Sequence, residues 1–246
     1  MIDRLQQWLP RLVLAPSFIV ILLFVYGFIA YTGVLSFTDS KMLASYDFVG
    51  FENYAKLFGL TNWKTALVNL AIFATLYIVI CSIVGLLIAI LLDQKIRAEG
   101  LLRPIYLYPM ALSFIVTGTA WKWFLDPGIG LENIMHLWGW ESFSFTWIKD
   151  RDFAIYTLVI AAVWQSSGFV MAMFLAGLRG VDNEIIRAAQ IDGATGIRIY
   201  TRIIVPMMRP VFLSAFVVLM HLAIKVYDLV IAMTGGGPGR ATEMPA

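Results

Sequence analysis

The sequence predicts an all-α integral membrane protein with about five membrane-spanning helices. Three observations support this fold class: 60% of the 246 residues are hydrophobic, only 14% are charged, and long apolar runs recur along the chain. Soluble domains are typically about 45–50% apolar and about 25% charged, so this chain has too few polar side chains to cover a water-facing surface. A net charge of +2 is too small to suggest nucleic-acid binding.

Five apolar runs reach the length of about 20 residues that a membrane-crossing helix needs. The first is too long for the core of a signal peptide, so we interpret it as an uncleaved anchor. The residues before it, 1–11, place Ile2, Leu5 and Trp8 on one helical face, which predicts a short helix lying in the membrane interface or, equally, a frayed terminus. The five runs are 12–37, 66–92, 104–125, 153–178 and 211–232.

The orientation follows from the distribution of lysine and arginine in the connections between the runs, because cytoplasmic loops carry the excess. The connections 1–11, 93–103 and 179–210 hold ten of these residues, whereas the longer connections 38–65, 126–152 and 233–246 hold six. The first set, and with it the N-terminus, is therefore predicted to face the cytosol.

A polar segment, residues 182–206, lies between the last two apolar runs on that predicted cytoplasmic side. Asp182 can cap a helix, and apolar residues follow at helical spacing. The sequence "DGATG" should break this helix, since Gly193 or Gly196 can adopt a positive φ. A second helix, "IRIYTRIIV", then leads to Pro206. The segment is predicted to be a helix–turn–helix that another protein contacts, or else an interfacial loop that covers its own helices.

The same segment, "RAAQIDGATGIRIYTRIIVPMMRP", resembles the cytoplasmic loop of binding-protein-dependent ABC importer permeases. That family's pattern is Glu-Ala-Ala, two residues, Asp-Gly-Ala, and Leu-Pro about a dozen positions later. The chain is also similar to the maltose and glycerol-phosphate type of sugar permease in "LLDQKIRAEGLLRPIYLYP" and "YDLVIAMTGGGPGRATE", and looks closest to glucose or mannose permeases in "YPMALSFIVTGTAWKW" and "AGLRGVD". The positions that match the loop pattern in register are Ala188, Ala189, Asp192, Gly193, Ala194 and Pro206.

The resemblance implies a type I importer fold in which this loop is the coupling helix that docks on an ATPase subunit. Arg187 stands where the family has glutamate, which places any family salt bridge there in doubt; Glu184 lies three residues earlier on a neighbouring helical face. We expect a single permease domain over residues 1–246 with a core transport region at 66–232. Family members continue into a further membrane helix, so we expect the chain to be C-terminally truncated or to lack that helix.

The sequence offers little support for nucleotide binding or catalysis. "TGGGPGRAT" superficially resembles a phosphate loop, but its glycines are one residue too close and Arg240 and Ala241 replace the lysine and hydroxyl residues of that motif. The single cysteine, Cys81, and the two histidines form no recognisable metal or catalytic set. We therefore expect no cofactor on this chain, with ATP and magnesium bound by partner ATPase subunits.

Several polar residues interrupt the apolar runs. Lys225 and Asp228 are three residues apart and can share a helical face, which predicts a structural ion pair or, alternatively, a sugar contact. Other polar and aromatic side chains could hydrogen-bond or stack on a sugar, although small polar residues also hold membrane helices together. The substrate-path candidates are Trp164, Gln165, Ser166, Thr117 and His221.

Together these features predict a permease subunit of a bacterial ABC importer for a carbohydrate, in the plasma (inner) membrane. Its expected partners are a second, different permease subunit, two ATPases, an extracytoplasmic sugar-binding protein and membrane lipid. Two rival hypotheses are a membrane scaffold without a substrate path and a membrane-embedded enzyme. The polar residues within the apolar runs argue against the scaffold, and the lack of a recognisable catalytic set argues against the enzyme.

Overall fold

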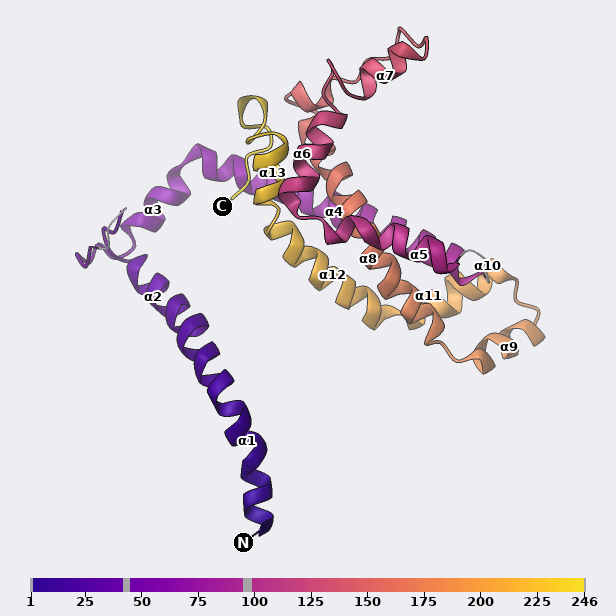
Figure 1. Cartoon of the computed structure of the whole chain (residues 1–246), viewed down its shortest axis with the longest axis horizontal. Helices are drawn as coiled ribbons and strands as arrows, with labels where there is room; N and C mark the ends of the chain where they lie inside the picture. Colours follow the sequence, from indigo (N-terminus) through magenta and orange to yellow (C-terminus); the bar gives the residue numbers. More distant parts are fainter. Residues whose placement is uncertain (1, 42–44, 95–98, 246) are drawn as a thin grey trace. The chain divides into compact units, whose positions relative to one another are not determined.

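The computed structural model describes residues 2–41, 45–94 and 99–245, and this described part is built from helices with an isolated bridge between Thr38 and Phe48. The predicted all-α class is therefore confirmed. The chain divides into two compact units, Met1–Trp63 and Lys64–Ala246, which Figure 1 shows in indigo to purple and in purple to yellow. Each unit is described by itself.

The first unit begins with one long helical segment. α1 (Ile2–Ile21) continues through a π-helical turn, η1 (Leu22–Tyr26), into α2 (Gly27–Leu35). Its apolar part, Val13–Leu35, is long enough to cross a membrane, and none of its most apolar window is buried inside the protein. The first predicted span is confirmed. α1 has no break at residue 11, so residues 2–11 belong to the same helix; their location in the interface stays a prediction.

An aromatic cluster closes the first unit after α2. Phe37 packs against Phe51 and Tyr54, with ring centroids 5.3 and 5.6 Å away. Asn53, on α3 (Glu52–Gly59), donates from Nδ2 to the carbonyl oxygens of Ser36 and Thr38 at 3.1 and 2.9 Å. Aromatic rings with polar handles suit the boundary between membrane and water, so this cluster fits the predicted outer connection.

α8 (Ala154–Arg179) is the central helix of the second unit. Two thirds (67%) of its most apolar window is buried, against 28% for the longer α4 (Thr61–Asp93). Neighbouring helices approach it at glycines: a Cβ on Gly168 would collide with the carbonyl of Tyr106, and one on Gly85 of α4 would come within 2.7 Å of Val170. Small residues permit such close packing between membrane helices, which explains how α8 is covered on several sides.

The third predicted span, 104–125, is wrong as a single straight helix. α5 (Glu99–Leu107) passes into a 3-10 turn, η2 (Tyr108–Ala111), and α6 (Phe114–Phe124) leaves at 100° to them. Leu112 is extended between them, and Ser113 caps α6 by accepting from the Val116 N–H at 3.3 Å. Pro109 in η2 lacks an N–H and cannot continue the α-helical ladder, so the apolar run folds as two half-helices.

The fifth predicted span, 211–232, is also divided, into α12 (Arg209–Ile224) and α13 (Tyr227–Met233). α13 lies beside α6 (Figure 1), where a Cβ on Gly118 would come within 2.8 Å of Ala232. A further bend of 66° separates α12 from the preceding segment Gly196–Met207. In the described residues three helices could each span a membrane, and the predicted number of five is reached if each bent pair counts as one span.

The two ends of the second unit carry different connections. α7 (Leu131–Leu137) and the 3-10 turn η3 (Trp147–Lys149) belong to the long connection 126–152, which is structured as predicted: the Phe145 N–H donates to Glu132 at 3.1 Å. α9 (Asn183–Ile191) lies at the opposite end (Figure 1). This separation agrees with the assignment of 126–152 and 179–210 to opposite sides of the membrane.

The glycine-rich stretch near the C-terminus forms a tight turn followed by a 3-10 turn, η5 (Pro238–Arg240). Gly235, Gly236 and Gly237 all have positive φ, and the Thr242 N–H donates to the Gly236 carbonyl at 2.9 Å. Asn69 of α4 holds this turn by donating to the carbonyls of Arg240 and Glu243 at 3.3 and 3.0 Å.

Candidate functional site

The segment 182–206 folds as the predicted helix–turn–helix. Asp182 caps α9 by accepting from the Glu184 N–H at 2.9 Å. α9 ends at Ile191. Gly193 follows two residues later with a φ of +76°, which favours glycine, and the Ala194 N–H donates to the Ala189 carbonyl at 2.9 Å. The second arm comprises α10 (Gly196–Ile199), the π-helical η4 (Tyr200–Ile204) and α11 (Val205–Met207), which contains the exposed Pro206.

The tip of this loop exposes apolar side chains. Ile191 is 87% exposed and Ile197 is 80% exposed, one on each side of the turn. Ala188, Asp192 and Gly193 are exposed beside them, and a Cβ on Gly193 would meet no other atom within 4 Å. An apolar tip with small residues next to it can enter a groove on another protein.

Two of the small residues in the predicted docking set do not face outward. Ala189 is buried and Ala194 is half-buried, because the amide of Ala194 folds back onto the carbonyl of Ala189. The sequence pattern could not separate these two from Ala188 and Gly193. Glu184 and Arg187 are exposed, and within the described residues neither forms an ion pair.

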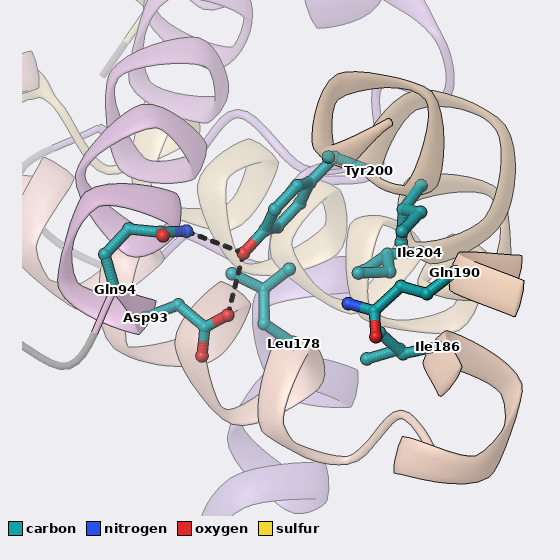
Figure 2. A pocket seen from close by; sticks show the side chains of 9 residues that line it. Asp93, Gln94, Leu178, Ile186, Gln190, Tyr200 and Ile204 are labelled. Carbon is teal, nitrogen blue, oxygen red and sulfur yellow. Dashed lines mark hydrogen bonds between the residues drawn. The ribbon is translucent and has the colours of Figure 1, made fainter. Parts of the chain in front are cut away.

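The base of the loop holds a polar network that sequence reasoning missed (Figure 2). The phenolic hydroxyl of Tyr200 donates to Asp93 Oδ2 at 2.9 Å and accepts from Gln94 Nε2 at 3.0 Å. Asp93 Oδ1 also lies 3.8 Å from Arg179 Nε. In the sequence, the signal for this network was Asp93, an acidic residue directly after the apolar run 66–92. Its partners Arg179 and Tyr200 lie 86 and 107 positions away along the chain.

Gln165 and Ser166 are buried inside the subunit. Gln165 is 5% exposed and donates from Nε2 to the Leu112 carbonyl at 2.7 Å, while Ser166 accepts from the Tyr77 hydroxyl at 2.7 Å. These contacts place Gln165 and Ser166 against other helices of this subunit and not on its outer surface, where a substrate path shared with a partner would lie. Leu112 lies at the break between η2 and α6, so Gln165 satisfies a carbonyl that a continuous helix would have satisfied itself.

Trp164, the neighbour of Gln165, lies on an open face of the second unit. It is 41% exposed and meets Trp121 of α6 edge to face, with ring centroids 5.8 Å apart. These two rings, Phe124 and Ala120 line a hollow of about 340 Å³, which we call the aromatic hollow. Ala120 and Phe124 were not among the predicted substrate-path residues, because the bend before α6 decides which faces of α6 and α8 meet.

The remaining substrate-path candidates lie elsewhere. Thr117 is fully buried on α6, and its Oγ1 has no hydrogen-bond partner among the described residues. His221 is exposed on α12 and does not line the aromatic hollow. Trp164 is therefore the one predicted substrate-path residue that lines this hollow.

Lys225 and Asp228 do not form the predicted ion pair. Both side chains are exposed, and no ion pair joins them in the part of the chain that the structure describes. The physical reason is a break in the helix: α12 ends at Ile224, Lys225 has φ −88° and ψ 12°, and Asp228 belongs to α13. The helical spacing of three residues therefore does not apply across this position.

Comparison with known families agrees with this geometry. Residues 81–245 match the family described as binding-protein-dependent transport system inner membrane component. The chain belongs to this family. Its members are membrane transport components, so the expectations of a membrane-embedded permease and of a subunit that is not an enzyme are confirmed. The permease is similar to several curated proteins.

A probable ABC transporter permease protein of Pyrococcus horikoshii is 40% identical, over 94% of this chain and 80% of that protein. The xylose/arabinose import permease protein of Haloferax volcanii is 34% identical, over 89% of this chain and 69% of that protein. A trehalose/maltose transport system permease protein of Thermococcus litoralis is 30% identical, over 83% of this chain and 69% of that protein.

Solved structures share the fold of the permease. A bacterial ABC transporter that imports the acidic polysaccharide alginate matches with a TM-score of 0.80 at 20% identity, covering 98% of this chain and 81% of that chain. A second structure, of a bacterial alginate transporter in complex with a periplasmic protein bound to an alginate pentasaccharide, matches equally well over 80% of its chain.

Proposed function

We propose that this permease subunit carries a carbohydrate across the plasma membrane in an ATP-driven importer. The observation that carries the proposal is the helix–turn–helix loop between α8 and α12, with its exposed apolar tip at Ile191 and Ile197. Such a tip suits a groove on a partner subunit. The aromatic hollow and the carbohydrates named for several relatives support a sugar as the substrate.

In this proposal the loop 182–206 docks on a separate ATPase subunit, which binds ATP and magnesium. Glu184, Arg187, Ala188, Asp192 and Gly193 lie on the exposed part of the loop, where side chains of the ATPase can reach them. Arg187 calls for an acidic or hydrogen-bond-accepting group on the ATPase, because an exposed guanidinium pairs best with a carboxylate. Movement of the ATPases then displaces the loop and, through it, the membrane helices.

The substrate path in this proposal runs past the aromatic hollow on the open face of α6 and α8. Trp121 and Trp164 present flat apolar faces, which suit the C–H face of a pyranose ring. A second permease subunit would face the hollow and supply hydrogen bonds to the sugar hydroxyls. Gln165 and Ser166 stabilise the helix packing behind this surface.

The remaining partners follow from the same proposal. An extracytoplasmic sugar-binding protein delivers the carbohydrate at the end of the second unit that carries α7, and the N-terminus faces the cytosol. The lysine and arginine counts of the connections support this orientation.

The proposal is tested with the complex that co-purifies with the tagged permease from its native membrane. We expect an ATPase, a second permease and a binding protein, and ATP-dependent uptake of one of radiolabelled xylose, arabinose, trehalose, maltose or glucose into proteoliposomes. Co-purification without any ATPase, or an assembled complex that takes up none of these sugars, would contradict the proposal and favour a scaffold.

A further inference from the structure

The second arm of the helix–turn–helix loop and the end of α8 converge on one carboxylate. Arg179 is the last residue of α8, directly before the first arm, and its Nε lies 3.8 Å from Asp93 Oδ1. Tyr200 begins η4 in the second arm and donates to Asp93 Oδ2 at 2.9 Å. Asp93 is the last residue of α4, so three helical elements meet at its two oxygen atoms.

The same arginine extends the junction to α5. Arg179 Nη2 lies 2.8 Å from Glu99 Oε1, and Arg103 Nη2 lies 3.1 Å from the same oxygen. Glu99 is the first residue of α5, the half-helix that leads to the bend before α6. The polar contacts therefore connect the loop to α4 and to the broken pair of α5 and α6.

An open cleft of about 480 Å³ lies between part of the loop and the ends of α4 and α8. Its lining includes Leu178, Ile186, Gln190 and Ile204, with Tyr200, Asp93 and Gln94 at one side (Figure 2). The hydrogen bond from Tyr200 to Asp93 joins the loop to α4 at one side of this cleft.

The backbone at Tyr200 is also unusual. η4 is a π-helix, and the segment Gly196–Met207 bends by 66° relative to α12. π-helical turns inside α-helices are frequent at functional sites, and a bend allows the arm to move relative to α12. A fixed contact at Tyr200 would determine which helices move together with the loop.

We propose that Tyr200 and Asp93 form a latch that fixes the loop to α4 and, through Arg179 and Glu99, to α5. This inference rests on the proposed function. With the latch closed, displacement of the loop by the ATPases moves α4 and α5; without it, the loop moves while these helices lag behind. Tyr200 and Asp93 are positioning residues that contact neither sugar nor nucleotide.

The test is Tyr200→Phe in the assembled complex, because this change removes the hydroxyl and keeps the ring. We expect the number of ATP molecules hydrolysed per sugar imported to rise about tenfold or more, since a hydrogen bond to a charged group changes an equilibrium by roughly that factor. A variant that merely assembled less well would lower uptake and ATP hydrolysis together and leave their ratio unchanged. The sugar is the one of the five named above that the wild-type complex takes up.

The matched control is Thr201→Val. Thr201 is the next residue in η4, and its hydroxyl donates to the Ile197 carbonyl at 2.8 Å, within its own helix. Its loss should leave the ratio of ATP hydrolysed to sugar imported unchanged. An equal rise in both variants would show that any lost hydroxyl on this segment has the effect, and the latch would be refuted.

A second variant, Asp93→Asn, weakens both contacts and should raise the ratio more than Tyr200→Phe does. The double variant should then be no worse than Asp93→Asn alone, because the two residues act through one contact. An unchanged ratio in Tyr200→Phe, or effects that multiply in the double variant, would overturn the latch while leaving the proposed function intact. A wild-type complex that hydrolyses ATP but imports none of the sugars would instead overturn the proposed function, and the latch with it.

Discussion

α8 and the helix–turn–helix loop that follows it in the chain are held in different ways. α8 is buried along most of its length and is approached by other backbones at glycine positions such as Gly168. The loop has an exposed tip, an open cleft beneath it, and a base held by a few buried apolar residues such as Ile199 and Ile204 and by the hydrogen bond from Tyr200 to Asp93. Close packing holds α8 along its length, whereas the loop has fewer buried residues and an exposed tip, which suits a segment that moves in the proposed transport cycle.

The largest effect is expected where packing is closest. Gly168→Val would drive a side chain into the carbonyl of Tyr106, which is backbone and cannot give way as a side-chain end can. We expect destabilisation of more than about 3 kcal/mol and loss of assembled protein from the membrane. The measurement is the yield of monodisperse complex after detergent extraction, with Gly33→Val as a control, because a Cβ on Gly33 meets no atom within 4 Å. Normal yield from Gly168→Val would contradict the close packing of α5 on α8.

A bulky change at the loop tip should leave assembly intact and remove transport. Gly193→Trp fills the space beside Ile191 and places a side chain at φ +76°, which costs about 1–2 kcal/mol locally. We expect uptake and sugar-stimulated ATP hydrolysis to fall at least about tenfold, in keeping with the loss of a central contact at an interface. Gly193→Ala tests the backbone strain without the bulk of the tryptophan. Gly196→Ala, at an exposed position without positive φ, introduces neither strain nor bulk and serves as the control. Normal uptake by a well-assembled Gly193→Trp complex would remove the docking role from this loop.

Within α8, two neighbouring residues should separate stability from transport. Gln165→Leu leaves the Leu112 carbonyl without its donor, so we expect a loss of about 1–3 kcal/mol in stability. Trp164→Ala removes a ring from the aromatic hollow and should raise the KM for sugar uptake severalfold while thermal unfolding changes less. Both variants are compared for Tm and for uptake kinetics, with the affinity of the binding protein for sugar measured separately. If Gln165→Leu alters KM with an unchanged Tm, the assignment of packing and transport roles to these residues is reversed.

The smallest effect is expected at Lys225 and Asp228. Both side chains are exposed, and among the described residues no ion pair joins them, so neutralising one does not leave the other as an unpaired partner. Lys225→Met and Asp228→Asn should each change stability by less than about 0.5 kcal/mol, measured by thermal unfolding of the complex. A strong defect in each single variant that the double variant relieves would restore the predicted pair.

The sequence was sufficient to predict the membrane class, because apolar runs of about 20 residues have few other uses. It was also sufficient for the loop, since Asp182 and Gly193 mark helix ends by local chemistry. It was insufficient for the bend at Leu112, where Pro109 has an obvious local effect but the angle depends on how α6 packs against α13. The rotation of α8 could not be predicted either: the helix is apolar nearly all round, and no periodicity distinguishes Trp164 from Gln165.

The junction at Asp93 illustrates a different limit. Its partners, Arg179 and Tyr200, come from other helices, and each charge or hydroxyl taken alone is ordinary at the end of a membrane helix. The one expected pair, Lys225 and Asp228, was predicted from spacing on a continuous helix and was wrong because the helix ends between them. Polar contacts between distant segments depend on the tertiary arrangement, which a single sequence does not specify.

The helix break at Leu112 has a consequence for the order in which the chain can be synthesised and inserted. The Leu112 carbonyl is satisfied by Gln165, and Gln165 is made 53 residues later. An unsatisfied backbone group is costly in the hydrocarbon of a bilayer, so the half-helices α5 and α6 cannot settle in lipid as soon as they leave the ribosome. They must wait beside the insertion machinery, or in contact with water, until α8 is complete. α1 and α2 do not depend on a hydrogen bond from a membrane helix that is made later, so they can enter the bilayer at once.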